Sequence, residues 1–201
     1  IESWHGKGRN RYVITPRFAI SCSTEQLIAA GRLHDQYPGT YIQTHLSENK
    51  DEIDSTLSLC PDCQDYLEVY ERARLVTDRS IFGHCIHLSD SECRRLVEAG
   101  SVVAHCPTSN LFLGSGLFDM QQANRVGMQT VLATDIGAGT SFSMLRTMGE
   151  AYKVQQLGGY PMSVFESLYK CTLGAAKALH LDDEIGCFGK GRKADFIVMD
   201  Y

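Results

Sequence analysis

The sequence contains no apolar run that approaches the roughly 20 residues needed to span a bilayer. It also contains no long run of lysine and arginine, and its formal net charge is −5. Proteins that bind nucleic acids or anionic membranes through general electrostatics carry basic patches. We therefore expect a soluble globular protein without a nucleic-acid or membrane partner.

The sequence shows no secretory signal pattern, and it begins with Ile1 instead of methionine. We therefore expect a piece of a longer chain. Its eight cysteines do not require disulfides, since 201 residues can build a core without them. Reduced thiols and a cytoplasmic location are the expectation. Cys60 and Cys63 resemble half a zinc knuckle, but without a second pair two free thiols in a loop are the preferred interpretation.

Apolar segments alternate with helical segments along most of the chain. Ser23 with Gln26, and Ser89 with Glu92, form capping-box patterns that open two of the helices. Strands are expected at 12–15, 41–45, 80–84, 101–105 and 130–135, helices at 23–34, 51–59, 66–74, 89–100, 120–126, 143–157 and 163–179, and a loop at 110–116.

This alternation predicts parallel βα units joined by right-handed crossovers. Such units form either an open doubly wound sheet or part of a (β/α)8 barrel. The polar residues at the expected carboxyl ends are Arg17, His45, His84, His105 and Asp135. In a barrel these ends meet at one mouth, whereas in an open sheet they spread along an edge. We therefore predict an α/β fold, an incomplete (β/α)8 TIM-type barrel.

The C-terminal part of the chain has a different pattern. Residues 185–191 are rich in glycine, and residues 194–200 have the composition of a strand that no helix follows. We therefore place a boundary near Asp182. Residues 1–182 are predicted to form the barrel, and residues 183–201 the start of a small C-terminal β-sandwich element.

His45, His84 and Asp135 are nitrogen and oxygen donors of the kind that suits Zn²⁺ or Fe²⁺. A single histidine is more often a structural residue, but equivalent positions in successive βα units favour a metal site. Glu48 follows His45 by three residues, where a carboxylate can handle the protons of a metal-bound water.

Several motifs together resemble the amidohydrolase superfamily, and within its deaminase branch the bacterial guanine deaminases. The resemblance covers essentially the whole chain. The motifs are Ile-Thr-Pro-Arg-Phe (14–18), Thr-His-Leu-Ser-Glu (44–48), Gly-His-Cys (83–85), Ala-His-Cys-Pro-Thr-Ser-Asn (104–110), Leu-Gly-Ser-Gly-Leu-Phe (113–118), Ala-Thr-Asp-Ile-Gly-Ala-Gly (133–139), Ser-Phe-Ser-Met-Leu (141–145) and 185–196.

The resemblance implies barrel strands four to eight and one divalent metal ion, zinc or alternatively iron. His45 and Asp135 would be metal ligands, and His84 would polarise the attacking water and is a further candidate ligand. The family's His-x-His pair on strand one is absent from this sequence, so the resemblance implies that residues 1–201 alone bind metal weakly and do not turn over.

The resemblance also implies a reaction: guanine and water give xanthine and ammonia in purine catabolism. Glu48 would shuttle protons, with His84 and Asp135 as the other catalytic residues. Arg17 and the backbone at Phe18 would hold the carbonyl edge of guanine, and His45, Glu48 and Asp135 would also border the substrate. A homodimer is expected.

Two alternatives remain open from the residues. One is another aminohydrolase of the same superfamily, acting on adenine-type, cytosine or triazine rings. The other is a non-catalytic fragment that serves as an interaction module. His105 is interpreted as a residue that supports a metal ligand or the core without binding the metal, because its strand has no metal role in the family.

Overall fold

The computed structural model describes residues 1–200, which form a sheet of five parallel strands. The strands lie in the sheet in chain order, and each pairs in parallel with the next. The strands are β1 (Val13–Ile14), β2 (Tyr41–Leu46), β3 (Ser80–His84), β4 (Val102–His105) and β5 (Gln129–Leu132).

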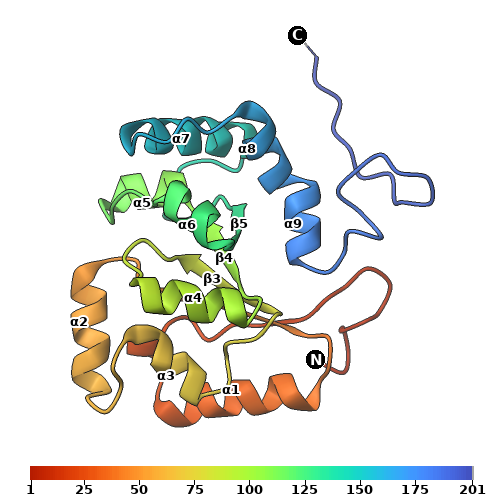
Figure 1. Cartoon of the computed structure of the whole chain (residues 1–201). Coiled ribbons are helices and arrows are strands. Elements are labelled where there is room, and N and C mark those ends of the chain that lie inside the picture. Colours follow the sequence, from red (N-terminus) through yellow and green to blue (C-terminus); the bar gives the residue numbers. More distant parts are fainter. Residues whose placement is uncertain (201) are drawn as a thin grey trace.

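Helices connect successive strands and cover the sheet (Figure 1). Figure 1 shows α1 and α3 at one end of the molecule and α7 and α8 at the other, with the strands between them. The helical elements are η1 (Ala19–Ser21), α1 (Thr24–Gln36), α2 (Lys50–Leu59), α3 (Tyr66–Arg72), α4 (Asp90–Glu98), α5 (Pro107–Leu113), α6 (Met120–Val126), α7 (Met144–Leu157), α8 (Val164–Cys171) and α9 (Leu173–Ala178).

Side-chain caps fix where several helices begin. The expected capping boxes at Ser23 and Ser89 are confirmed, and Asn49 forms a third one with Glu52 at the start of α2. In each box the cap oxygen accepts a backbone N–H that the helix itself leaves without a partner. The start of α2 matters for the site, because Glu48 directly precedes the cap residue Asn49.

The strands are buried on both faces, as expected for a parallel sheet covered by helices. All four residues of β4 are buried, and so are four of the five residues of β3. Ile42, Leu46 and Phe82 are fully buried and pack with the helices into one core. Burial of such side chains contributes about 1.5–3 kcal/mol each. This core holds the carboxyl ends of the strands in a rigid arrangement.

Four local expectations differ from the structure. The expected strand 130–135 ends three residues earlier, because β5 stops at Leu132. Residues 194–200 form no strand, because they have no partner strand among residues 1–200, and their backbone remains exposed to solvent. The expected loop at 110–116 overlaps helix α5, and the expected helix 163–179 divides into α8 and α9 at Thr172, whose ψ is −105°. Tyr201, the last residue of the expected C-terminal element, lies outside the described residues.

The two terminal segments lie on the same side of the molecule (Figure 1). Arg9 forms an ion pair with Asp195, and Arg11 Nη2 lies 3.1 Å from Glu184 Oε1. Both pairs are solvent-exposed or half-buried, so each contributes little to stability. They nevertheless hold the C-terminal segment against the N-terminal one.

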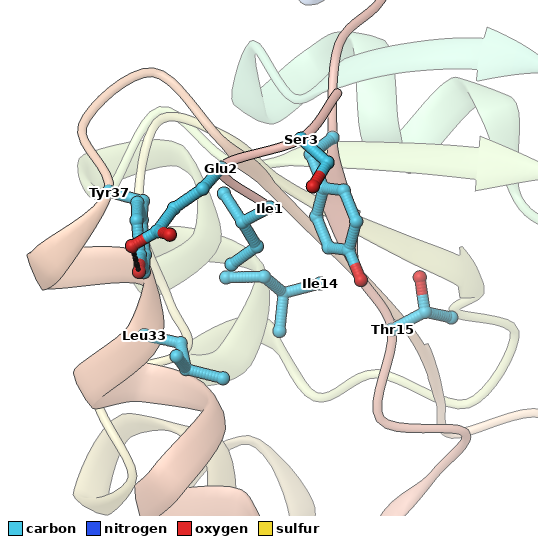
Figure 2. Close-up of a pocket in the computed structure, with 8 residues that line it drawn as sticks. Ile1, Glu2, Ser3, Ile14, Thr15, Leu33 and Tyr37 are labelled. Carbon is cyan, nitrogen blue, oxygen red and sulfur yellow. Dashed lines mark hydrogen bonds between the residues drawn. The ribbon is translucent and has the colours of Figure 1, made fainter. Parts of the chain in front are cut away.

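The first residues cover one edge of the sheet. Figure 2 shows the side chains of Ile1, Ile14 and Leu33 turned toward one another, and a hydrogen bond of 2.8 Å joins Tyr37 Oη to Glu2 Oε1. None of the residues that line this hollow is a candidate site residue.

Among residues 1–200, no helix combines the length and apolar character that crossing a membrane would require.

Gly31 marks the tightest contact between α1 and the turn after α3. A methyl group at this position would lie 2.0 Å from the carbonyl oxygen of Ala73. Gly31→Ala is expected to lower the free energy of unfolding by about 1–3 kcal/mol, since neither backbone can move away easily. The matched control is Gly149→Ala in α7, where a methyl group meets nothing within 4 Å. It is expected to raise stability by up to about 1 kcal/mol. Denaturant unfolding measures both, and equal effects would contradict this packing.

Candidate functional site

Because the five strands run in parallel and in order, their carboxyl ends lie side by side along one edge of the sheet. His84 and His105 are the last residues of β3 and β4, and His45 is the penultimate residue of β2. Arg17 and Asp135 each follow their strand by three residues. All five predicted polar residues therefore lie along the same edge of the sheet.

Three of the predicted side chains, those of His45, Glu48 and Asp135, converge on the imidazole of His84. Its Nε2 atom lies 3.7 Å from Glu48 Oε2 and 3.9 Å from Asp135 Oδ2. The ring of His45 stacks on that of His84, with 5.2 Å between the centroids and 21° between the planes. His84 is only 2% exposed, whereas the Asp135 side chain is 30% exposed. The cluster thus has a buried floor and one side open to solvent.

The backbone at this edge adopts unusual conformations. His84 has a φ of 69°, Asp135 has 47°, and Ser47 and Cys85 have 49° and 53°. Residues other than glycine rarely occupy this left-handed region, at a cost of order 1–3 kcal/mol each. The N–H of Cys85 donates to Leu46 O at 2.9 Å, which holds one of these turns. Such strain gathers at functional sites, because the fold must impose the direction in which the side chains point.

Hydrogen bonds orient both imidazoles. The Nδ1 of His45 lies 2.5 Å from the carbonyl oxygen of Arg17, and the Nδ1 of His84 lies 2.8 Å from Oδ1 of Asn110. Both partners are oxygen acceptors, so Nδ1 carries the hydrogen and donates in each ring. In the neutral rings the lone pair is then on Nε2. Metal-binding histidines are oriented in the same way, by a bond from the nitrogen that does not bind the metal.

The carboxylate of Glu48 is positioned from two sides. Its Oε1 accepts a hydrogen bond of 3.0 Å from Ser115 Oγ, and its backbone N–H donates to Glu52 Oε2 at 2.8 Å. The remaining oxygen, Oε2, faces His84. The Nε2 lone pair of a neutral His84 therefore meets two carboxylates, those of Glu48 and Asp135, and no side chain of residues 1–200 forms a hydrogen bond with this atom. Such a group of acceptors is stabilised by a cation or by a proton.

The chemistry of these donors fits a divalent metal ion. One ligand atom from each of His84, Cys106 and Asp135 can be chosen so that the three lie within 4.8 Å of one another. Burial raises the pKa of the Cys106 thiol to about 12, and a protonated thiol is a weak ligand. His84 and Asp135 are the nitrogen and oxygen donors of this group, and His45 stacks directly on His84. The predicted ligand pair, His45 and Asp135, stays a prediction.

His105 does not join this cluster. Its side chain is fully buried, its ring stacks on Phe118 with centroids 4.8 Å apart, and neither ring nitrogen has a hydrogen-bond partner among the described residues. Burial lowers its pKa to about 3, so the ring is neutral. This environment agrees with a structural residue.

Arg17 and Phe18 border the cluster on the β1 side. The Arg17 guanidinium lies 4.9 Å from the centre of the Phe18 ring, and that ring lies 5.6 Å from the ring of His45. The carbonyl oxygen of Arg17 also accepts hydrogen bonds from Thr44 Oγ1 and from the N–H of His45. The Arg17 backbone thus orients His45, and its exposed guanidinium is free to meet a ligand.

Sequence reasoning assigned no role to Asn110, Ser115 or Cys106. All three lie in the motifs 104–110 and 113–118, which carried the family resemblance as whole segments. Helix α5 brings Asn110 into contact with His84. The sequence does carry a signal for this helix, because Pro107 stands in its first turn, where proline is favoured. The contact between Ser115 and Glu48 spans 67 positions in the chain and has no local signal.

The parallel sheet, the left-handed strand ends and the cluster of imidazoles and carboxylates define a class of α/β barrel protein with a polar site at the carboxyl ends of its strands. Residues 1–201 match the sequence profile described as Amidohydrolase family. The chain belongs to the amidohydrolase family. Its five strands are strands four to eight of an incomplete (β/α)8 TIM-type barrel, as predicted from the sequence.

Relatives with a curated name agree with this placement. The chain is 52% identical over 200 residues to the guanine deaminase of Escherichia coli (strain K12), covering 100% of this chain and 46% of that protein. It is 42% identical to the probable guanine deaminase of Deinococcus radiodurans, covering 98% of this chain and 46% of that protein. The chain therefore spans about half the length of these relatives.

Solved structures show the same fold. The structure of E. coli guanine deaminase superimposes with a TM-score of 0.97 at 53% identity, covering 99% of this chain and 46% of that one. Guanine deaminase from C. acetobutylicum with bound guanine in the active site gives 0.82 at 34% identity, with 89% and 44% covered. An adenosine deaminase from Xanthomonas campestris with bound zinc gives 0.89 at 25% identity, with 96% and 44% covered.

The role of Asn110 as the support of His84 can be measured directly. Asn110→Ala removes the acceptor of a buried N–H, which costs about 1–3 kcal/mol of unfolding free energy. It should also release the tautomer, so that ¹⁵N chemical shifts of the His84 ring report a mixture. The control is Asn124→Ala, whose hydrogen bonds to Tyr160 and Glu166 are exposed. Equal destabilisation in the two variants, with the His84 ring unchanged, would contradict this role.

Proposed function

We propose that the intact protein catalyses the hydrolytic deamination of guanine to xanthine and ammonia. The observation that carries the proposal is the convergence of Glu48, Asp135 and His45 on His84, in a chain 52% identical to a guanine deaminase. Two carboxylates and two oriented imidazoles supply the proton acceptors that hydrolysis by an activated water requires. The exposed Arg17 supplies a donor for an oxygen-bearing ring.

We propose one divalent metal ion, zinc, with iron as the alternative, held by His45 and Asp135 and approached by His84. Support comes from the mixed nitrogen and oxygen donors and from the related adenosine deaminase with bound zinc. When bound, such an ion would lower the pKa of a coordinated water to about 7.

Each residue then has a distinct task. Asp135 and Glu48 accept the proton of the attacking water, whose oxygen adds to C2 of guanine, the carbon that bears the amino group. Glu48 delivers a proton to the adjacent ring nitrogen, N3, which makes C2 more electrophilic. His84 stabilises the charge that develops on the oxygen. A final proton transfer to the amino group lets ammonia leave and yields xanthine.

Substrate selection is assigned to Arg17 and Phe18. Guanine presents the acceptor O6, which a guanidinium with fixed donors can bind, and the Phe18 backbone offers a further polar contact. Adenine carries an amino group at the same position and would leave Arg17 without an acceptor. His45, Glu48 and Asp135 would border the reacting side of the ring.

Three further properties are proposed for the whole protein. Residues 1–182 belong to the barrel, and residues 183–201 begin a C-terminal β element. The protein is expected to be a homodimer. A cytoplasmic location is supported by the eight cysteines, all of which are free in the structure.

Glu48→Gln tests the proton shuttle. The amide keeps the size of the side chain and can still contact Ser115, but it cannot accept a proton. We expect kcat to fall at least about 100-fold, as is typical when general acid–base catalysis is lost, while bound metal measured by atomic absorption is unchanged. Glu98→Gln on the exposed face of α4 is the control and should retain full activity. Full turnover of Glu48→Gln would remove Glu48 from the mechanism.

A substrate panel separates this proposal from its rivals. Guanine, adenine, adenosine and cytosine are assayed with the protein extended at its N-terminus and with residues 1–201 alone. We expect guanine to be deaminated by the extended protein, and residues 1–201 to bind metal weakly and show no turnover, because the His-x-His pair is missing. Preference for adenine or cytosine over guanine would favour another aminohydrolase. If neither the extended protein nor residues 1–201 turned over any substrate, a non-catalytic module would be favoured. Equal activity of the two proteins on guanine would show that the missing pair is dispensable.

A further inference from the structure

Cys60 and Cys63 lie together in the short connection between α2 and α3. Cys60 follows the last residue of α2, and the backbone N–H of Cys63 donates to the carbonyl oxygen of Cys60 at 3.0 Å. This bond closes a four-residue turn, in which Pro61 presets the backbone angle of the second position. A turn of this kind keeps the two end Cα atoms within about 7 Å.

The spacing suits a disulfide, which needs Cα atoms about 4.4–6.8 Å apart. Both thiols are free, and both residues are half-buried, so a small reagent can reach them. They line the same hollow, between α1 and α3. Among residues 1–200, neither cysteine belongs to a group of three metal-type ligands, which argues against a zinc site here.

Neighbouring side chains hold the turn in place. The Arg72 guanidinium donates to the carbonyl oxygen of Asp62 and to the carboxylate of Glu68, which lies one turn earlier in α3. The backbone N–H of Gln64 donates to the other oxygen of Glu68 at 2.7 Å. The two cysteines are thus held close together while they are still reduced, which lowers the entropic cost of joining them.

We propose that Cys60 and Cys63 form a reversible dithiol–disulfide pair that exchanges with small disulfides such as oxidised glutathione. One cysteine thiolate attacks the oxidant, the S–S bond of the oxidant breaks, and one small thiol leaves. The second cysteine thiolate then attacks the mixed disulfide and releases the second small thiol. Two electrons and two protons pass from the protein to the oxidant, and an excess of reduced thiol reverses both steps.

The position of the pair links it to the candidate site. Glu52 of α2 accepts hydrogen bonds from the N–H of Glu48 and from Tyr66 Oη, at 2.8 and 2.7 Å, and Tyr66 is the first residue of α3. The connection that carries the cysteines therefore joins the two helices that hold the Glu48 backbone. The exchange itself does not depend on the proposed deaminase activity.

Thiol mapping of the intact protein tests the proposal. The protein is treated with oxidised glutathione, free thiols are alkylated, and tryptic peptide 51–72, which contains only these two cysteines, is analysed by mass spectrometry. We expect an internal disulfide in this peptide, reversed by an excess of reduced glutathione. The exposed Cys187 serves as an internal standard and should keep a glutathione adduct.

The single variants Cys60→Ser and Cys63→Ser provide matched controls. In each, the remaining cysteine lacks its partner, so the glutathione adduct should persist on peptide 51–72. The proposal is overturned if, in the unmodified protein, the peptide stays reduced or keeps adducts while Cys187 reacts. The readout is covalent mass, so it stands whether or not the protein deaminates guanine.

Discussion

The parallel register between β2 and β3 is the constraint on which the site depends. It pairs His45 with Gly83 and Leu46 with His84. The two imidazoles can therefore stack across neighbouring strand ends, with no side chain on Gly83 between them. A slip of one strand by one residue would turn its side chains to the opposite face of the sheet and separate the two rings. The apolar core of Ile42, Leu46 and Phe82 opposes such a slip.

A buried hydrogen-bond network supports this register from the helix side. The Tyr70 hydroxyl accepts from the N–H of Ala19, donates to the carbonyl oxygen of His45 at 2.8 Å, and lies 3.1 Å from Thr44 Oγ1. Burial raises the pKa of Tyr70 to about 12, so the hydroxyl keeps its proton and remains a donor at neutral pH. Helix α3 thus stabilises the backbone of β2 at His45, whose ring stacks on His84. Tyr66, at the start of α3, stabilises α2 through its hydrogen bond to Glu52.

The elements that local sequence predicted well are those whose causes are local. Capping residues begin α1 and α4 where the pattern placed them, and buried β-branched segments form β2, β3 and β4 within one residue of expectation. One of the errors has a non-local cause, because residues 194–200 have a strand's composition but no partner strand among the described residues. The separation of α8 from α9 coincides instead with a close local contact between Gly174 and Tyr169.

The sequence by itself determined that the candidate histidines and carboxylates stand at or just after strand ends, because strand periodicity and residue type are properties of single segments. It also determined the fold class, since alternating strands and helices of these lengths allow few topologies. Only the tertiary structure decided which nitrogen of each imidazole is free, that Asn110 and Ser115 orient His84 and Glu48, and that His105 is buried against Phe118. Those outcomes depend on contacts between residues far apart in the chain, and no local pattern encodes such contacts.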